Sequence, residues 1–238
     1  MLYQVATLLL SPIFIVQGKY VKRVTVKLPE PEGLRHGMMG NGVPASLLII
    51  GDSAAAGVGV EHQDQALTGI MLSTLSPHYQ VSWKLMAQTG DTSGQLLDKI
   101  SRSGSHESYD TVVISIGVND VTGLTSTQTW INNLNMITTA LQEKFAVKRI
   151  LFSSLPPMHL FPALPHPLRW WLGTRAKQLN KLAEQFCRQT ANCSFINVPY
   201  PLDPRFVATD GFHPGAPAYQ LWGEYLAEII HEQLSIDM

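Results

Sequence analysis

The run Leu47-Leu48-Ile49-Ile50 is followed directly by Gly51-Asp52-Ser53. Four large aliphatic residues in a row, with no polar residue between them, are typical of a parallel β-strand that is buried on both faces. The stretch therefore predicts a central strand that ends near residue 51. It places a serine hydroxyl just beyond the carboxyl end of that strand.

The rest of the chain alternates between similar apolar runs and helix-like segments. Further strands are expected at 81–87, 111–117, 149–153 and 195–198, and helices near 63–76, 93–102, 127–145, 169–190 and 215–234. This alternation predicts an α/β fold, a three-layer α/β/α sandwich with a mainly parallel central sheet of about five strands. Ligands of such sheets bind at the carboxyl ends of the strands, so residues that directly follow the strands are expected to converge there.

Composition indicates one globular domain with few charges on its surface. The chain has 238 residues, of which 45% are hydrophobic and 15% charged, and its formal net charge is −1. Nucleic acid is not an expected partner, because a surface that binds it needs a basic patch or stripe. We expect a main domain at 45–238, preceded by an apolar segment at 1–18 and by a basic, then glycine- and proline-containing linker at 19–44.

The cysteines and histidines do not form a recognisable metal site. Cys187 and Cys193 are six residues apart, which is not the C-x-x-C spacing, and no neighbouring histidines complete a zinc site. Apart from His213, the histidines are scattered along the chain without i, i+4 pairs. We expect neither a metal ion nor an organic cofactor.

Two short motifs contain the residue types that together activate a hydroxyl group. Ser53 follows the first strand, and Asp210-Gly211-Phe212-His213-Pro214 places a carboxylate three residues before an imidazole. A serine becomes a nucleophile at neutral pH when a base takes its proton, and the base needs a partner that fixes its tautomer. Ser53, His213 and Asp210 are the candidates for these three roles.

A third motif, Gly117-Val118-Asn119-Asp120, follows the strand expected at 111–117. Nucleophilic attack on an acyl group gives a tetrahedral intermediate with a negatively charged oxygen, which hydrogen-bond donors must stabilise. The candidate donors of this oxyanion hole are the backbone N–H of Ser53, the backbone N–H of Gly90 and the side-chain amide of Asn119. Gly90 suits the role because a residue without a side chain allows close approach to its N–H.

Each of these residues alone also has an ordinary structural explanation. Ser53 could be a turn or N-cap residue, His213 a turn residue ahead of a helix, and Gly90 a turn glycine. We expect Asp52 to be a structural hydrogen-bonding residue and Asp120 to cap the helix that begins beside it. The catalytic interpretation rests on the occurrence of all the motifs together and in order.

In that order the motifs resemble the SGNH branch of the GDSL esterases and lipases, a family named after a Ser, a Gly, an Asn and a His in four separated blocks. Ser53, Asn119 and His213 stand in the matching motifs, and Gly90 is similar to the glycine of the second block. That block matches least closely, because members often carry an asparagine shortly before the glycine, where this chain has Gln88. The resemblance extends from about residue 45 to the C-terminus.

The resemblance implies a carboxylic-ester hydrolase with a Ser-His-Asp triad and an acyl-enzyme intermediate. Members of the family hydrolyse acylglycerols, lysophospholipids, acyl-thioesters and acetylated sugars, so an esterase, lipase or lysophospholipase-like activity on small-molecule or lipid esters is expected. A carbohydrate O-acetyl esterase is the alternative within enzymes. A membrane-associated, non-catalytic binding protein on the same fold is the alternative from another class.

A proline-rich apolar loop at 156–168 is the expected source of substrate contacts. Its five prolines predict an extended loop, and Phe161 and Leu164 are candidates for one wall of an acyl-chain pocket or for a lip near the site that faces a membrane. Alternatively, the loop folds over the core of its own domain, with Trp170 and Trp171 buried in the next helix.

The N-terminal segment has no charged residue before Lys19, and three more basic residues follow by position 27. A secretory signal carries its positive charges before the apolar part, and a bilayer-spanning helix needs about 20 apolar residues. Three interpretations remain: an interfacial anchor, a short spanning helix, or a segment packed on its own domain. The basic cluster favours contact of residues 1–27 with anionic lipid, with the main domain on the cytoplasmic side.

Overall fold

A computed structural model describes residues 2–104, 107–201 and 203–236, with only the backbone described for residues 2–6. Six strands form one sheet in the order β1-β3-β2-β4-β5-β6. All neighbouring strands are parallel except β1, which runs antiparallel to β3. The strands are β1 (His36–Met39), β2 (Val43–Gly51), β3 (Tyr79–Ala87), β4 (Thr111–Ser115), β5 (Arg149–Ser153) and β6 (Cys193–Ile196).

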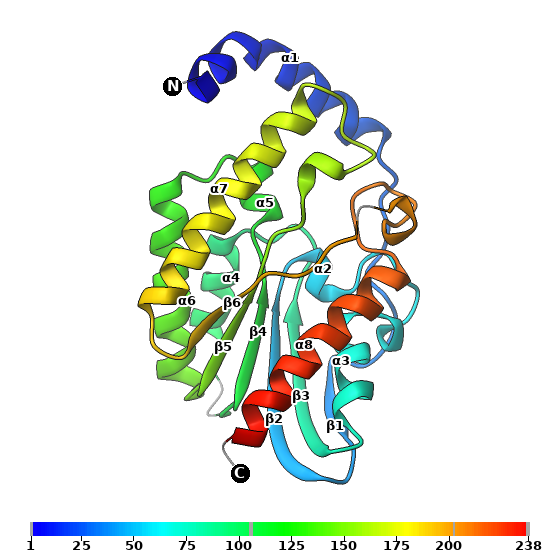
Figure 1. Ribbon diagram of the computed structural model, residues 1–238, viewed down its shortest axis with the longest axis vertical. Coiled ribbons are helices and arrows are strands. Elements are labelled where there is room, and N and C mark those ends of the chain that lie inside the picture. The colour runs from blue at the N-terminus through cyan, green and yellow to red at the C-terminus, as the bar shows by residue number, and fades with distance from the viewer. Residues whose placement is uncertain (1, 105–106, 202, 237–238) are drawn as a thin grey trace.

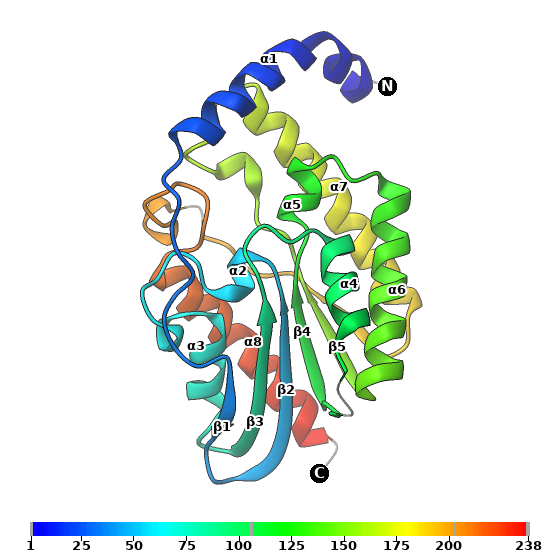
Figure 2. The ribbon, with the colours of Figure 1, turned by 180° about the vertical axis from the view of Figure 1, so that it is seen from behind.

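Helices cover both faces of the sheet (Figures 1 and 2). Helices α3 and α8 lie on one face, and α4, α6 and α7 lie on the other. The helices are α1 (Leu2–Val24), α2 (Ser53–Ala56), α3 (Leu67–Leu75), α4 (Ser93–Arg102), α5 (Val118–Thr122), α6 (Thr127–Phe145), α7 (Leu168–Gln189) and α8 (Ala216–Ile236). The described residues also include three short 3₁₀ turns, at 63–65, 158–160 and 204–206.

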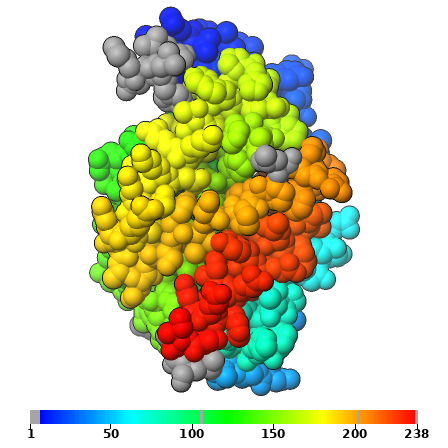
Figure 3. Space-filling view, viewed as in Figure 1, coloured from blue at the N-terminus to red at the C-terminus, as the bar shows by residue number. Residues whose placement is uncertain are grey.

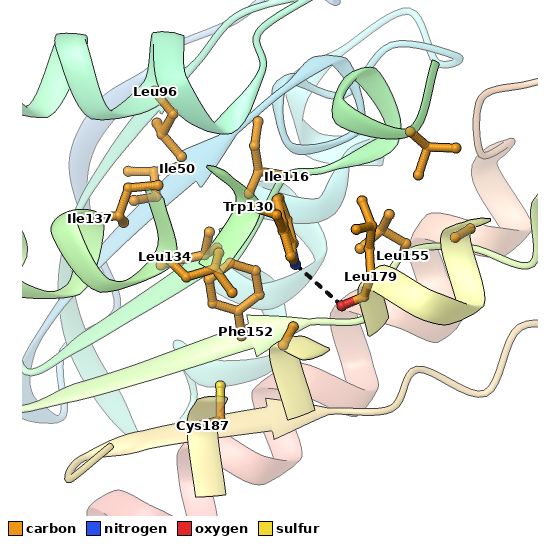
Figure 4. Packing of buried hydrophobic residues seen from close by; sticks show 14 of the residues in the cluster. Ile50, Leu96, Ile116, Trp130, Leu134, Ile137, Phe152, Leu155, Leu179 and Cys187 are labelled. Carbon is orange, nitrogen blue, oxygen red and sulfur yellow. Dashed lines mark hydrogen bonds between the residues drawn. The ribbon is translucent and has the colours of Figure 1, made fainter. Parts of the chain in front are cut away.

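The apolar run of β2 fills both cores of the sandwich. Successive side chains of a strand point to opposite faces. Leu48 and Ile50 accordingly belong to the core beneath α4, α6 and α7, and Leu47 and Ile49 to the core beneath α3 and α8. In the first core the indole N–H of the fully buried Trp130 donates to the main-chain oxygen of Leu179, 3.3 Å away, so that α6 is tied to α7 (Figure 4).

The expected fold class is confirmed, and each of the five expected strands is present. The sixth strand, β1, lies in the stretch expected to be a linker. Its residues face outward on most positions and include a glycine, so they show no apolar pattern. β1 forms through hydrogen bonds to β3, with His36 opposite Lys84, and this pairing is not visible in its own sequence.

The N-terminal helix α1 packs against α7. Phe14 stacks on Trp171 with ring centroids 4.6 Å apart, and the Trp171 indole N–H donates to the Thr7 hydroxyl at 2.8 Å. Gln17 donates to the main-chain oxygen of His166 and accepts from the N–H of Leu168, so it brackets the start of α7. None of the described helices is long and apolar enough to cross a membrane.

Candidate active site

The candidate nucleophile stands on a sharp turn between β2 and α2. Gly51 has a φ of +154°, and a Cβ there would lie 1.9 Å from the main-chain oxygen of Ser115, so the turn requires glycine. The Asp52 carboxylate then caps α2 by accepting from the N–H of Ala54 at 3.1 Å. As a result, Ser53 is held at the first position of α2, next to the carboxyl end of the sheet.

Ser53, His213 and Asp210 form one hydrogen-bonded chain. The Nε2 of His213 lies 2.8 Å from the Ser53 hydroxyl oxygen, and its Nδ1 lies 2.5 Å from Oδ2 of Asp210. With Nδ1 protonated toward the carboxylate, Nε2 is free to accept the serine proton. The structure therefore brings together the three residues that the sequence placed in catalytic roles, across 160 residues of chain.

The turn before α8 fixes the carboxylate of this chain. The Oδ1 of Asp210 accepts from the N–H groups of Phe212 and His213, both at 3.0 Å, while Oδ2 faces the imidazole. Burial alone would raise the pKa of Asp210, but the hydrogen bonds from the His213 ring and from these two N–H groups hold it below its ordinary value. Asp210 is therefore an anion at neutral pH and can stabilise a protonated His213.

The three candidate oxyanion donors lie on three successive strand ends. Ser53 follows β2, Gly90 follows β3, and Asn119 lies in α5 after β4. Gly90 is exposed, has a φ of +90° and has nothing within 4 Å of the position of a Cβ. Asn119 donates from Nδ2 to the main-chain oxygen of Asp91 at 2.9 Å, so the amide of one candidate is tied to the turn that carries another.

A cavity of about 250 Å³ opens beside the Ser53 hydroxyl. Ser53, Asn119 and His213 line it together with a mainly apolar wall, which includes Ile116, Leu155, Pro156, Phe161, Phe206 and Phe212. Gly90 is outside this lining. The candidate donors Ser53 and Asn119 thus share one cavity with the candidate base.

The structure separates the two substrate-binding candidates of the proline-rich loop. Phe161 lines the cavity, and its ring meets that of Phe212 edge to face at 5.8 Å. Leu164 is 2% exposed and packs into the core, away from the cavity lining. Trp171 is buried as well, whereas Trp170 is exposed. The loop therefore both borders the cavity and folds over the core of its own domain.

Asp52 is a second buried carboxylate beside the nucleophile. Burial raises its pKa to about 7, with smaller contributions from the carboxylates of Asp120 and Asp91, against the hydrogen bond from Ala54 and the nearby His213. This agrees with the expected structural hydrogen bond. The raised pKa of Asp52 was not predicted from the sequence.

Asp120 does not cap the helix that begins beside it. It lies inside α5, fully buried, and accepts from the backbone N–H of Ser93 at 2.8 Å and from its hydroxyl at 2.6 Å. Asn133 donates to the same hydroxyl at 2.8 Å. The carboxylate thus joins α5 to the start of α4, because a tertiary partner satisfies it in place of the local N–H groups.

Charged residues outside the motifs hold the turn that contains Gly90. The Glu30 carboxylate accepts from the N–H and the hydroxyl of Thr89, at 2.7 and 2.8 Å. The Lys99 ammonium donates to the carboxylate of Asp91, on the other side of the glycine, and to the side-chain oxygen of Gln88. Sequence reasoning missed Glu30 and Lys99, since neither belongs to a recognisable motif.

Within the described part of the chain, no group of three or more His, Cys, Asp or Glu side chains is arranged to hold a metal ion. Cys187 and Cys193 are free thiols whose Sγ atoms lie 3.0 Å apart in the core.

The order of these motifs along the chain is that of a known protein family. The model of the GDSL-like lipase/acylhydrolase family matches residues 49–221, which include Ser53, Gly90, Asn119, Asp210 and His213. The chain belongs to this family. The resemblance found in the motifs is thereby confirmed.

A curated protein is similar to this chain in sequence over most of the chain. The GDSL-like esterase Rv1075c of Mycobacterium tuberculosis strain H37Rv is 27% identical over 202 residues, which are 79% of this chain and 62% of that protein. The chain thus spans less than two thirds of the length of this curated relative.

Two solved structures have the same fold. The lipase/acylhydrolase of Enterococcus faecalis superposes with a TM-score of 0.58 and 21% identity, covering 79% of this chain and 96% of that one. Est24, a carbohydrate acetylesterase of Sinorhizobium meliloti, superposes with a TM-score of 0.58 and 18% identity, covering 79% and 99%.

Proposed function

We propose that this member of the GDSL-like family is a carboxylic-ester hydrolase that acts through an acyl-enzyme on Ser53. The observation that carries the proposal is the continuous chain from the Ser53 hydroxyl through the His213 imidazole to the Asp210 carboxylate. Each link has hydrogen-bond length, and the carboxylate is held as an anion. This is the arrangement that general-base activation of a serine requires.

In the proposed reaction, His213 takes the proton of Ser53 as its oxygen attacks the ester carbonyl carbon. The carbonyl oxygen becomes negative and accepts hydrogen bonds from the N–H groups of Ser53 and Gly90 and from the Asn119 amide, each worth roughly 3 kcal/mol in the transition state. The intermediate collapses, and His213 gives its proton to the leaving alcohol. Water, activated by His213, then releases the acid and restores the Ser53 hydroxyl.

The apolar cavity favours an ester with a short-to-medium or lipid-like acyl chain. An acyl chain attached to Ser53 can lie along the wall that includes Leu155, Phe161 and Phe212, where it is shielded from water. The acyl chain of a lipase or lysophospholipase-like substrate would bury its apolar surface against this wall.

A carbohydrate O-acetyl esterase is the second candidate. Est24, which has the same fold, is described as a carbohydrate acetylesterase, and an acetyl group also fits a cavity of about 250 Å³. The two candidates differ in the expected acyl length. An acetyl group leaves most of the apolar wall unused, which is why we prefer the longer acyl chain.

A fluorophosphonate probe tests the proposed nucleophile, because only an activated serine reacts with it. We expect labelling of the wild-type protein, none of Ser53→Ala, and normal labelling of Ser115→Ala, which removes another serine hydroxyl that lines the cavity. Labelling of Ser53→Ala would contradict the proposal. An unlabelled but folded wild type would favour the non-catalytic binding protein.

A p-nitrophenyl ester series from acetyl to palmitoyl tests the substrate class. A maximum at medium or long chains, lost in Ser53→Ala, supports the acyl-chain interpretation. A maximum at acetyl would favour the O-acetyl esterase instead.

A further inference from the structure

Helix α1 exposes apolar side chains on the face where a surface helix of a globular protein normally carries polar residues. Leu8, Leu9 and Val16 are 77%, 72% and 67% exposed, and Ile13 and Ile15 are exposed too. Between residues 8 and 16 every exposed side chain of the helix is apolar. We define the outer face of α1 as the exposed residues Leu8, Leu9, Pro12, Ile13, Ile15, Val16 and Tyr20.

The opposite face of α1 is sufficient to hold the helix on the domain. The less exposed positions recur every three or four residues and include Thr7, Phe14 and Val21, as expected for one side of a helix. Phe14 and Val21 are buried in the core that α7 shares. The apolar residues of the outer face are therefore not required for packing on this chain, and their surface is available to a partner.

The charge next to the outer face indicates what that partner is. Residues 1–29 contain four of the 17 basic residues of the chain and none of its 18 acidic residues. Arg23 follows Val16 by seven residues and so continues the same side of the helix. The four basic side chains, Lys19, Lys22, Arg23 and Lys27, are all exposed. Apolar side chains followed by exposed cations match the acyl region and the anionic headgroups of a lipid surface.

We propose that α1 docks the protein onto an anionic lipid bilayer, with its outer face in the interface and its basic end among the headgroups. The helix would lie in the plane of the surface. This inference goes beyond the proposed ester hydrolysis and does not depend on it. It concerns where the protein works and leaves the reaction unchanged.

Docking through α1 would turn the cavity end of the molecule toward the lipid. Helix α1 crosses the molecule beyond the carboxyl ends of the strands, at the end where α2 and the candidate site lie (Figures 1 and 2). In the space-filling view α1 forms the outermost ridge of that end, above the loop and the start of α7 (Figure 3). Gln17 bonds to the backbone at His166 and Leu168, in the loop whose residues Pro156 and Phe161 line the cavity.

Vesicle flotation of the full chain tests this proposal. The probes are vesicles of phosphatidylcholine alone and vesicles that contain phosphatidylglycerol as an added anionic lipid. We expect the wild type to float with the anionic vesicles, and Leu9→Glu/Val16→Glu to bind them at least tenfold more weakly. Met136→Glu is the matched control, because it makes the same kind of change at an exposed position of α6 and should bind like the wild type.

The basic residues are tested separately from the apolar ones. Lys22→Gln/Arg23→Gln should reduce binding to anionic vesicles several-fold and make it less sensitive to salt, whereas Arg102→Gln/Lys181→Gln, at exposed positions of α4 and α7, should not. Hydrolysis of a water-soluble ester and the melting temperature should be unchanged in all four variants. Unchanged melting shows that a loss of binding is not a loss of fold.

Two results would overturn the proposal. The first is a wild type that stays unbound with both kinds of vesicle at low salt. The second is a wild type that is dimeric by light scattering and becomes monomeric in Leu9→Glu/Val16→Glu without any vesicle binding, because a second copy of the chain would then cover the outer face. Vesicle binding is measured without turnover, so failure of the proposed esterase activity leaves this test intact.

Discussion

The Asn119 side-chain amide donates to the main-chain oxygen of Asp91 at 2.9 Å, and so links α5 to the turn that carries Gly90. One hydrogen of this amide is used by the link, and the other is free to face the cavity that Asn119 lines. The residue therefore has two functions in the proposed site. In the proposed reaction it donates to the oxyanion, and its bond to Asp91 fixes the turn of the neighbouring candidate donor, Gly90.

Replacing Asn119 by alanine should lower kcat by about 100- to 1,000-fold on a p-nitrophenyl ester, because an oxyanion donor acts mainly in the transition state. KM should change little. Asn133→Ala is the control: it removes the same amide from a bond to Ser93, at a position that does not line the cavity. Equal losses of kcat in the two variants would show that the effect comes from packing rather than from the oxyanion.

The ion pair of Lys99 with Asp91 should position the Gly90 N–H. Lys99→Met keeps much of the side-chain length but removes the donor to both Gln88 and Asp91, which flank the glycine. We expect kcat to fall about tenfold with KM nearly constant, since small displacements of a catalytic donor are costly. The Lys99→Arg variant should recover most of kcat.

A comparison with Lys148→Met separates positioning from a general loss of surface charge. Lys148 forms an ion pair with Asp110, remote from the Gly90 turn in the sequence, and is 67% exposed. Its removal should leave kcat unchanged, as expected for a weak surface pair. If Lys99→Met also leaves kcat unchanged, the turn is held without this ion pair.

The main strands could be predicted because their signals are local, and the candidate triad could be assembled from short motifs although Ser53 and His213 are 160 residues apart. Strands β2, β4 and β5 contain continuous apolar runs, and Asp210 and His213 belong to the same short turn. Strand β1 could not be predicted, because this exposed edge strand has neither a long apolar run nor alternation. Its pairing with β3 joins residues 42 to 48 positions apart in the chain, from Met39 with Val81 to His36 with Lys84.

The residues that hold the site in place could not be predicted either, because their partners are distant in the sequence. Glu30 reaches Thr89 across 59 residues, and the Asp120 carboxylate finds Ser93 across 27. The sequence predicted that Asp120 caps the helix beside it, but in the folded chain its carboxylate accepts hydrogen bonds from Ser93, at the start of α4. In the proline-rich loop no periodicity distinguishes Phe161, which borders both the cavity and the core, from Leu164, which lies in the core alone.

Ionisation of Asp52 should make the folded state less stable as the pH rises. In the unfolded chain this carboxyl ionises near 3.8, whereas burial in the folded protein raises its pKa to about 7. Between these values only the unfolded state loses the proton, so the free energy of unfolding falls with increasing pH. The difference between the two pKa values corresponds to a loss of at most roughly 4 kcal/mol in the free energy of unfolding.

Urea unfolding of Asp52→Asn between pH 4 and pH 8 checks this expectation. The amide oxygen can still accept from Ala54, and the variant lacks the titration, so it should gain stability relative to the wild type as the pH rises. Asp64 is exposed, so the free energy of unfolding of Asp64→Asn should change with pH in the same way as that of the wild type. A difference between Asp52→Asn and the wild type that stays constant with pH would mean that the buried carboxyl does not titrate in this range.

Phe161→Ala and Leu164→Ala should both lower stability, because both side chains are buried in the same core, but only Phe161→Ala should change substrate specificity. Phe161 lines the cavity beside Phe212, so its truncation should lengthen the space for the acyl chain and raise the preference for decanoyl over butyryl esters about tenfold in kcat/KM. Leu164 is buried in the core, so its truncation should lower the free energy of unfolding by about 2–5 kcal/mol and leave the chain-length profile unchanged. The p-nitrophenyl ester series and urea unfolding, applied to both variants, measure the two effects. A shifted chain-length profile in Leu164→Ala, with none in Phe161→Ala, would place the acyl chain on the other side of the loop.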